Sequence, residues 1–417
     1  MLVAPERGVR LNAPYSPSSL RKRPKTTRRA LQLLKAKKKT ECAAKTTKTS
    51  SSLPPGILVS VAKNVWNLGW GVMMSQLAPT DKASGKYARP ESQFRVKDFD
   101  IDFPLKGKKL YLFAGKTCPW AHRTLIVSEV VKKRLKTKSN NDDNAEDLQL
   151  EIIYLEPNKN TGLWMVPKEA IERIFFRDAD DEQQREMIIE TLRDVYSYVS
   201  GTKFEGRATA PLLISASSGG TFEILCNESA DIIRLFDCCL SKKESDEESA
   251  SLYPKEKRKE IDEMCAYLYE NVNNGVYKVG FAQSQDVLDD EVAKLFAALD
   301  ALDSRLASSR FLLGDDALTL CDVCFYTTLI RFDAVYNHLF RCSHKRICDY
   351  TNLSRYLKAL YALDEFREST DMVAIRNQYY TSLFPLNPGG LVPPLPFSST
   401  EAWLLSSSSP GPDDDHF

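Results

Sequence analysis

Long apolar runs are absent from this chain of 417 residues, and none is long enough to cross a membrane as a helix. A secretory signal is also absent, and the ten cysteines follow no spacing typical of a disulfide framework. We therefore expect no membrane span, and we expect the cysteines to be free thiols in a reducing compartment.

A complete zinc-binding pattern is missing as well. Cys321 and Cys324 are spaced as zinc ligands often are, but no second pair has a similar spacing. Cys342 and Cys348, with two nearby histidines, match such a pattern poorly. The sequence therefore predicts no metal site.

Acidic residues are nearly absent from the first fifty positions, which hold fourteen Lys and Arg but only Glu6 and Glu41 as acids. This stretch is also rich in Ser and Thr, as organellar transit peptides are, so we expect import into a plastid or mitochondrion. Two alternatives stay open: a disordered basic arm on a cytoplasmic protein, and a segment that binds nucleic acid. The remaining chain carries 43 basic and 54 acidic residues without a second basic patch, which argues against nucleic acid as a partner.

The composition otherwise suits a folded protein with two domains. Hydrophobic residues make up 43% of the chain and charged residues 27%, which is ordinary for a globular protein. We divide the sequence into a disordered basic targeting segment at 1–56, an N-terminal extension and linker at 57–93, an α/β domain at 94–240, an all-helical domain at 250–384 and a disordered tail at 385–417.

The most informative motif is Cys118–Thr124, which reads Cys-Pro-Trp-Ala-His-Arg-Thr and lies between a strand-like run and an apolar helical run. At such a junction the free backbone N–H groups and the helix dipole favour an anion, and so favour the thiolate of Cys118. Pro119 fits the first helical turn, where its missing N–H costs nothing. The motif predicts a reactive cysteine.

The order of strand and helix patterns predicts a small α/β unit followed by helices only. Four runs have strand character, at 109–113, 148–155, 211–214 and 221–225. The last two are joined by Ser-Ser-Gly-Gly, which indicates a hairpin, and a helix follows from about Asn227. Beyond residue 250 the apolar residues recur at helical spacing, and Thr319 and Asp322 form a capping-box-like helix start.

These features resemble a glutathione transferase, with a thioredoxin-like N-terminal domain followed by an all-helical C-terminal domain. The resemblance is most specific to the glutathionyl-hydroquinone reductases, the Xi-class glutathione transferases. It rests on three ordered motifs, at 118–124, 273–282 and 329–336.

The resemblance implies a glutathione site made of a tryptophan, a basic residue, the backbone before a cis-proline and a Glu-Ser pair. By motif these residues are Trp164, Arg207, Ala210, Pro211, Glu228 and Ser229. The ligand's backbone would pair with the edge of the sheet. Glu228 can accept a hydrogen bond from the γ-glutamyl ammonium, while Ser229 and the helix N-terminus can bind its carboxylate.

The resemblance also implies the reaction, which is the reductive removal of glutathione from glutathionyl-hydroquinones. Cys118 would attack the thioether sulfur, and a second glutathione would resolve the mixed disulfide, because Ala121 replaces the second cysteine of a dithiol motif. The hydroxyls of Tyr277 and Tyr336 are suited to stabilise the ring oxygen or to donate a proton. The implied partners are glutathione, an aromatic hydroquinone or quinone, and a second copy of the chain in a homodimer.

Four polar residues near these motifs are expected to have structural roles. We expect His122 to be partly solvated at the surface, and Arg331 and Asp333 to form a buried ion pair that shapes their helix. Asp322 is expected to cap a helix.

Two other functions stay open at this point. A general glutathione thiol transferase or dehydroascorbate reductase would also use Cys118, but would not depend strongly on Tyr277 and Tyr336. The non-enzymatic alternative is a transferase-like interaction module that binds its partner through the basic arm.

Overall fold

The computed structural model describes residues 55–81, 86–96, 108–139, 149–158, 161–176, 188–217, 220–241, 251–315, 317–383, 386–394 and 403–404. The expected targeting segment, except its last two residues, and most of the expected tail lie outside these ranges. The chain divides into two units, residues 1–65 and 66–417, and the sheet and helix bundle both belong to the second. Within the described ranges, no helix combines the length and apolar character that a membrane span requires.

Helix α2 (Pro55–Leu77) lies within the stretch described above as an N-terminal extension and linker. Many of its apolar side chains are exposed, from Ile57 to Val72, whereas Met74 near its end is fully buried. Only the last turns of α2 therefore contribute to the core.

A five-stranded mixed sheet, in the order β3-β2-β1-β4-β5, forms the α/β part. Its strands are β1 (Lys109–Gly115), β2 (Leu150–Pro157), β3 (Trp164–Met165), β4 (Leu212–Ala216) and β5 (Phe222–Cys226). β1 is parallel to β2 and antiparallel to β4, and β4 and β5 form the predicted hairpin. The thioredoxin-like expectation is thus confirmed at the level of strand order and direction.

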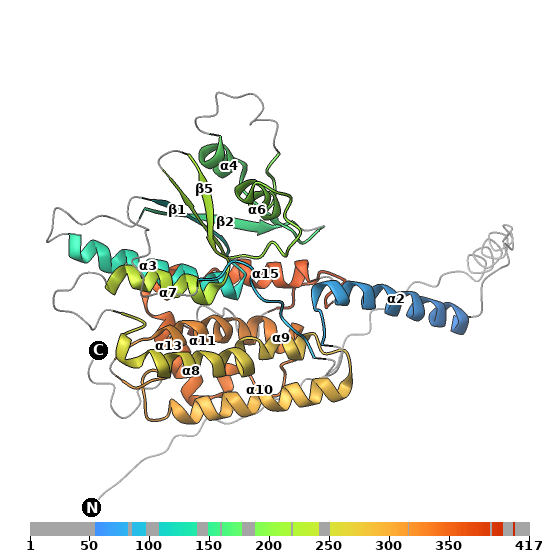
Figure 1. The fold of residues 1–417 in the computed structure, drawn as a ribbon. Helices are drawn as coiled ribbons and strands as arrows, with labels where there is room; N and C mark the ends of the chain where they lie inside the picture. The colour runs from blue at the N-terminus through green and yellow to red at the C-terminus, as the bar shows by residue number, and fades with distance from the viewer. Residues whose placement is uncertain are drawn as a thin grey trace, which may run out of the picture. The chain divides into compact units, whose positions relative to one another are not determined.

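Alternating side chains of β1 divide the core between the two faces of the sheet. Leu110, Leu112 and Ala114 pack with α3 (Pro119–Ser139) and α7 (Ser229–Ser241). Tyr111 and Phe113 face the opposite side, where α4 (Lys168–Phe175) and α6 (Leu192–Ser200) cover the sheet. Figure 1 shows these two helix pairs on opposite faces. This arrangement buries both faces of β1 and explains its nearly continuous apolar sequence.

Three of these elements have no counterpart among the sequence predictions. β3 is two residues long, α4 follows it, and α6 starts at a capping box made by Thr191 and Asp194. A two-residue strand has too little alternation to be read from sequence, and its pairing with β2 is a long-range choice.

Beyond residue 250 every regular element in the described ranges is helical, in agreement with the prediction. The longer helices are α8 (Arg258–Leu268), α10 (Gln285–Arg305), α11 (Leu320–Arg331), α13 (Thr351–Tyr361) and α15 (Met372–Ser382). The shorter ones are η2 (Lys255–Lys257), α9 (Gly275–Gly280), α12 (Asn337–Leu339), η5 (Ile347–Asp349) and α14 (Asp364–Glu368). Two π-helical segments, η3 (Tyr269–Asn273) and η4 (Phe332–Tyr336), extend α8 and α11. π-Helical segments are rare in proteins, and those that occur are often found at functional sites.

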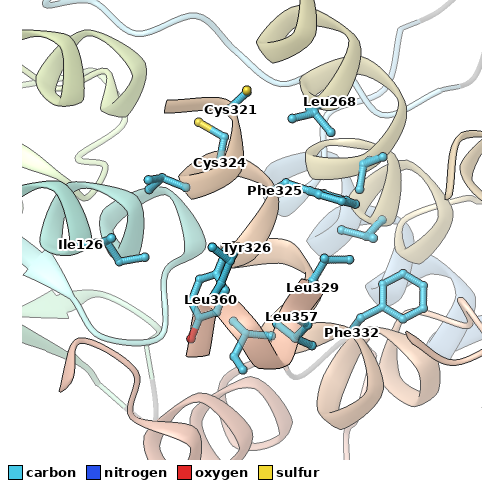
Figure 2. Packing of buried hydrophobic residues seen from close by; sticks show 14 of the residues in the cluster. Ile126, Leu268, Cys321, Cys324, Phe325, Tyr326, Leu329, Phe332, Leu357 and Leu360 are labelled. Carbon is cyan, nitrogen blue, oxygen red and sulfur yellow. The ribbon is translucent and has the colours of Figure 1, made fainter. Parts of the chain in front are cut away.

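Helix α11 is the centre of the helical part, because every one of its residues is buried. It packs against α8, α13 and, on a further side, α3 of the α/β part. Figure 2 shows this packing, in which Ile126 of α3 belongs to the same cluster as Tyr326 of α11 and Leu360 of α13. The two parts of the second unit therefore share one core through α3 and α11.

Candidate active site

Cys118 lies at the junction that the sequence predicts. β1 ends at Gly115, a short turn follows, and α3 begins at Pro119 directly after the cysteine. The Cys118 N–H donates to Gly115 O at 3.1 Å and closes the turn. Its side chain is only partly buried, and the sulfur lies 3.5 Å from Ala210 O. The thiol is thus accessible and lies beside the residue expected to pair with the ligand backbone.

The glutathione-site candidates Ala210 and Pro211 lie at the start of β4, and the peptide bond between them is cis, as the resemblance implies. Ala210 is buried, whereas Arg207 is exposed. Among the described residues Arg207 has no hydrogen bond or ion pair, so its side chain can extend toward a ligand.

Trp164, in the short strand β3, lies against the end of β1. A Cβ atom at Gly115 would stand 2.6 Å from Cζ3 of the Trp164 ring and closer still to Cη2, and glycine avoids this clash because it has no Cβ. Trp164 is half-buried, and its backbone pairs with that of Pro157 in β2. The tryptophan therefore lies next to the turn that carries Cys118.

Glu228 and Ser229 mark the start of α7, and their side chains are bonded to each other. Glu228 Oε1 accepts from Ser229 Oγ at 3.3 Å and from the Ala230 N–H at 3.2 Å. Its Oε2 accepts from Ser92 Oγ at 2.8 Å. Burial opposes ionisation of Glu228, but Arg89, Ser92 and the Ala230 N–H outweigh it, so the pKa of the carboxyl is lowered. Glu228 is an ionised cap of its own helix.

The two candidate tyrosines are close together and share a third tyrosine. The hydroxyl of Tyr379, from α15, lies 2.8 Å from the Tyr277 hydroxyl and 3.2 Å from the Tyr336 hydroxyl. Burial raises the pKa of all three, and the charge of Cys118 raises the pKa of Tyr277 and Tyr379 further. The three hydroxyls are therefore protonated at neutral pH, and are not phenolates.

Tyr379 is a candidate that the sequence prediction missed. It lies in an Asn-Gln-Tyr-Tyr stretch of α15 without a distinctive motif, and it is far from both partners in the chain. A second tyrosine, Tyr380, follows directly, and only the fold shows which of the two contacts the cluster.

Arg331 holds the turn before Cys118. The guanidinium is fully buried, and Nε donates to Thr117 O at 3.1 Å while Nη2 donates to Lys116 O at 3.3 Å. The expected ion pair with Asp333 is wrong. Asp333 instead accepts from the backbone N–H groups of the η5 turn, at 2.6 and 3.0 Å. Side chains two positions apart on a helix point in different directions, so Arg331 faces α3 and Asp333 faces away.

His122 is fully buried, so the expectation of a partly solvated surface histidine is wrong. Burial, and then the charge of Arg331, lower its pKa well below the usual value, and the ring is neutral. Arg331 Nη1 donates to Nδ1 at 2.9 Å, because a guanidinium has no acceptor. The proton is therefore on Nε2, which faces the hydroxyls of Ser369 and Thr370.

A capping box at the start of α11 confirms the role predicted for Asp322. Its Oδ2 accepts from the Thr319 N–H at 2.9 Å, and its Oδ1 accepts from the Leu312 N–H at 2.9 Å and the Tyr356 hydroxyl at 2.8 Å. No group of three or more metal-binding side chains occurs in the described part of the chain.

A partly exposed cysteine beside a cis-proline, at the start of the first helix of such a sheet, with an all-helical part behind it, defines a cysteine-type glutathione transferase. The family model "Glutathione S-transferase, C-terminal domain" matches residues 285–359. The fold is also similar to that of a Xi glutathione transferase from Phanerochaete chrysosporium, with a TM-score of 0.61 and 30% identity over 76% of this chain and 95% of that one. A glutathione-bound structure of YqjG from Escherichia coli has a TM-score of 0.57 and 32% identity, over 71% of this chain and 87% of that one.

The chain belongs to the glutathionyl-hydroquinone reductases, the Xi-class glutathione transferases. It is 32% identical to the glutathionyl-hydroquinone reductase PcpF of Sphingobium chlorophenolicum, over 84% of this chain and 100% of that protein. It is also 34% identical to the glutathione S-transferase omega-like 2 of Schizosaccharomyces pombe, over 79% of this chain and 99% of that protein.

Proposed function

We propose that this enzyme removes glutathione from glutathionyl-hydroquinones through a mixed disulfide at Cys118. The observation that carries the proposal is the position of the Cys118 sulfur, which is accessible, 3.5 Å from Ala210 O and close to a cluster of tyrosine hydroxyls. A plain thiol transferase needs the cysteine and the peptide site, but it has no use for proton donors beside the sulfur.

In the first step, the Cys118 thiolate attacks the sulfur of the thioether, and an S–S bond forms as the carbon–sulfur bond breaks. The electron pair of the broken carbon–sulfur bond passes to the ring, and the ring carbon that carried the sulfur must then gain a proton. Tyr277 and Tyr336 are proposed to hold the ring oxygen and to supply the proton, with Tyr379 bonded to both hydroxyls. Their raised pKa values keep them protonated for this role.

In the second step, the thiolate of another glutathione attacks the mixed disulfide. Oxidised glutathione leaves, and the Cys118 thiolate is restored. One thioether and one glutathione thus yield one hydroquinone and one glutathione disulfide. The resolving thiol is proposed to come from solution, since Ala121 occupies the position of a second cysteine in the motif.

The buried thiol of Cys226 is poorly suited to replace that second glutathione. Burial raises its pKa to about 12, and the sulfur is bonded to the backbone of Glu228 at both N–H and C=O. A thiol in that state supplies little thiolate for attack on a disulfide.

The glutathione moiety is proposed to lie between the sheet edge and the start of α7. Ala210 would pair with its backbone, Trp164 and Arg207 would contact it from β3 and the loop before β4, and Glu228 would accept from its ammonium. A homodimer and import into an organelle remain proposals that rest on the family resemblance and on the basic first fifty residues.

A general glutathione thiol transferase is the second candidate, because several omega-like glutathione transferases are about as similar to this chain as the reductases are. Mass spectrometry of Cys118 after exposure to glutathionyl-menadiol, a glutathionyl-hydroquinone, separates the two. We expect a glutathione adduct on Cys118 with release of the hydroquinone, and much slower release in Tyr336→Phe. An unmodified Cys118 without product would refute the proposal, and equal release rates would favour the thiol transferase.

A further inference from the structure

The start of α7 has fewer free donors for a ligand than a glutathione site needs. The γ-glutamyl end of glutathione carries one ammonium and one α-carboxylate. Glu228 suits the ammonium, but its own carboxylate already takes the Ser229 hydroxyl and the Ala230 N–H. The Ser229 hydroxyl and the Ala230 N–H are therefore engaged within the protein, which leaves the Ser229 N–H and any nearby cation for the ligand's carboxylate.

Arg89 is a cation at that place that is not held in an ion pair among the described residues. Its guanidinium carbon lies 3.8 Å from the ring centroid of Trp120, the second residue after Cys118. Among the described residues it forms no hydrogen bond or ion pair, and its side chain is half-buried. It lies near enough to Glu228 that its charge, after the opposing effect of burial, contributes to the lowered pKa of that carboxyl.

The segment that carries Arg89 is anchored to the same helix start. The Asn227 N–H donates to Phe94 O and the Phe94 N–H donates to Asn227 Oδ1, both at 3.1 Å, and Ser92 Oγ donates to Glu228 Oε2 at 2.8 Å. Arg95 forms a two-bonded ion pair with Asp231, at 2.6 and 3.1 Å. The segment 92–96 therefore holds Arg89 against the site, although Arg89 and Ser92 belong to the stretch expected to be a linker.

The surroundings of Trp120 carry an excess of positive charge. Arg123 lies 4.8 Å from the same ring, is buried, and has an Nε atom without any hydrogen-bond partner. Tyr269 contacts the ring from the helical part, with the centroids 5.8 Å apart. Both arginines act on the carboxyl of Glu228, while Asp231 is paired with Arg95. Burying this excess is favourable when an anion is bound there.

We propose that Arg89 binds the α-carboxylate of the γ-glutamyl residue, so that Arg89 and Glu228 together recognise the zwitterionic end of glutathione. This inference rests on the proposed function, because it assumes that glutathione is the ligand of the site. Trp120 orients the guanidinium by stacking, and the planar fork of arginine matches a carboxylate with two hydrogen bonds.

Isothermal titration calorimetry with S-methylglutathione tests this, because a blocked sulfur binds without reacting at Cys118. Two analogues show which group of the γ-glutamyl residue Arg89 contacts. S-methyl-(4-aminobutanoyl)-Cys-Gly lacks the α-carboxylate, and S-methyl-glutaryl-Cys-Gly lacks the amine. Arg89→Gln is expected to bind S-methylglutathione about 10- to 100-fold more weakly, and the aminobutanoyl analogue as tightly as the wild type does. Arg89→Lys is expected to recover part of the loss.

Arg173→Gln is the control, since it removes the same charge from an exposed pair with Glu151 away from the site, and thermal melts show that each variant is folded. It is expected to change the affinity less than threefold. Unchanged binding by Arg89→Gln overturns the proposal, as does an equal loss for S-methylglutathione and the aminobutanoyl analogue. If the weaker binding by Arg89→Gln disappears only with the glutaryl analogue, Arg89 acts through Glu228 on the ammonium group. That result also overturns the proposal. If the wild-type protein binds no S-methylglutathione, the proposed function fails as well.

Discussion

The guanidinium of Arg331 donates to Nδ1 of His122 at 2.9 Å, and so joins α11 to α3 directly behind Cys118. The same guanidinium donates to two carbonyl oxygens of the turn before the cysteine. The geometry of the reactive turn is thus supported by a residue more than two hundred positions away in the sequence.

Replacing Arg331 should therefore destabilise the protein. Arg331→Leu leaves buried carbonyl oxygens and a ring nitrogen without donors, and we expect it to lower the free energy of unfolding by about 3 kcal/mol or more. Chemical denaturation monitored by fluorescence measures this. Arg173→Leu is the control, because that arginine pairs with Glu151 at the exposed surface and should cost about 1 kcal/mol or less. Similar losses in the two variants would contradict the role given to Arg331.

The neutral state of His122 predicts a pH dependence of stability. Burial and Arg331 lower its pKa in the folded protein, whereas the unfolded chain binds a proton near pH 6.5. The neutral His122 therefore stabilises the folded protein fully above pH 6.5, and this stabilisation is lost as the pH falls below 6.5. The free energy of unfolding should fall by about 1.4 kcal/mol between pH 7.5 and 5.5. Denaturation at three pH values should show this slope in the wild type and a smaller slope in His122→Gln. The exposed His338 provides the control, since His338→Gln should keep the wild-type slope.

The hydroxyl of Tyr379 bridges the two candidate proton donors, and its removal should slow the release of the hydroquinone. We expect Tyr379→Phe to reduce the single-turnover rate of hydroquinone release about tenfold. The rate at which the variant exchanges thiols with a small glutathione mixed disulfide should stay unchanged. Tyr326→Phe is a matched control, because Tyr326 is equally buried but bonds to Thr370, away from the cluster. A similar rate loss in both variants would show that the effect is one of packing.

Two capping boxes of the same kind differ in burial and should differ in their contribution to stability. Asp322 is fully buried and bonded to Thr319, Leu312 and Tyr356, so Asp322→Ala should cost about 3 kcal/mol. Asp194 caps α6 near the surface, and Asp194→Ala should lower the free energy of unfolding by about 1 kcal/mol. Thermal melts of the two variants compare them, and equal losses would mean that burial of the cap is unimportant.

Local patterns in the sequence were sufficient for much of the fold. The Cys118 junction, the β4–β5 hairpin and the capping box at Thr319 were predicted correctly, since each depends on residues within a few positions of one another. The helical character beyond residue 250 followed from apolar spacing for the same reason.

Contiguous motifs were enough to predict the position of Cys118 between strand and helix, the order of the elements and the family. Tertiary structure alone decided that Tyr379 lies between tyrosines from two other helices, that His122 is buried, and that Arg89 lies on Trp120. Tyr379 is 102 positions from Tyr277, and no local pattern encodes a contact of that range. Such contacts arise only when helices from distant parts of the chain pack, and packing chooses which face of each helix is buried.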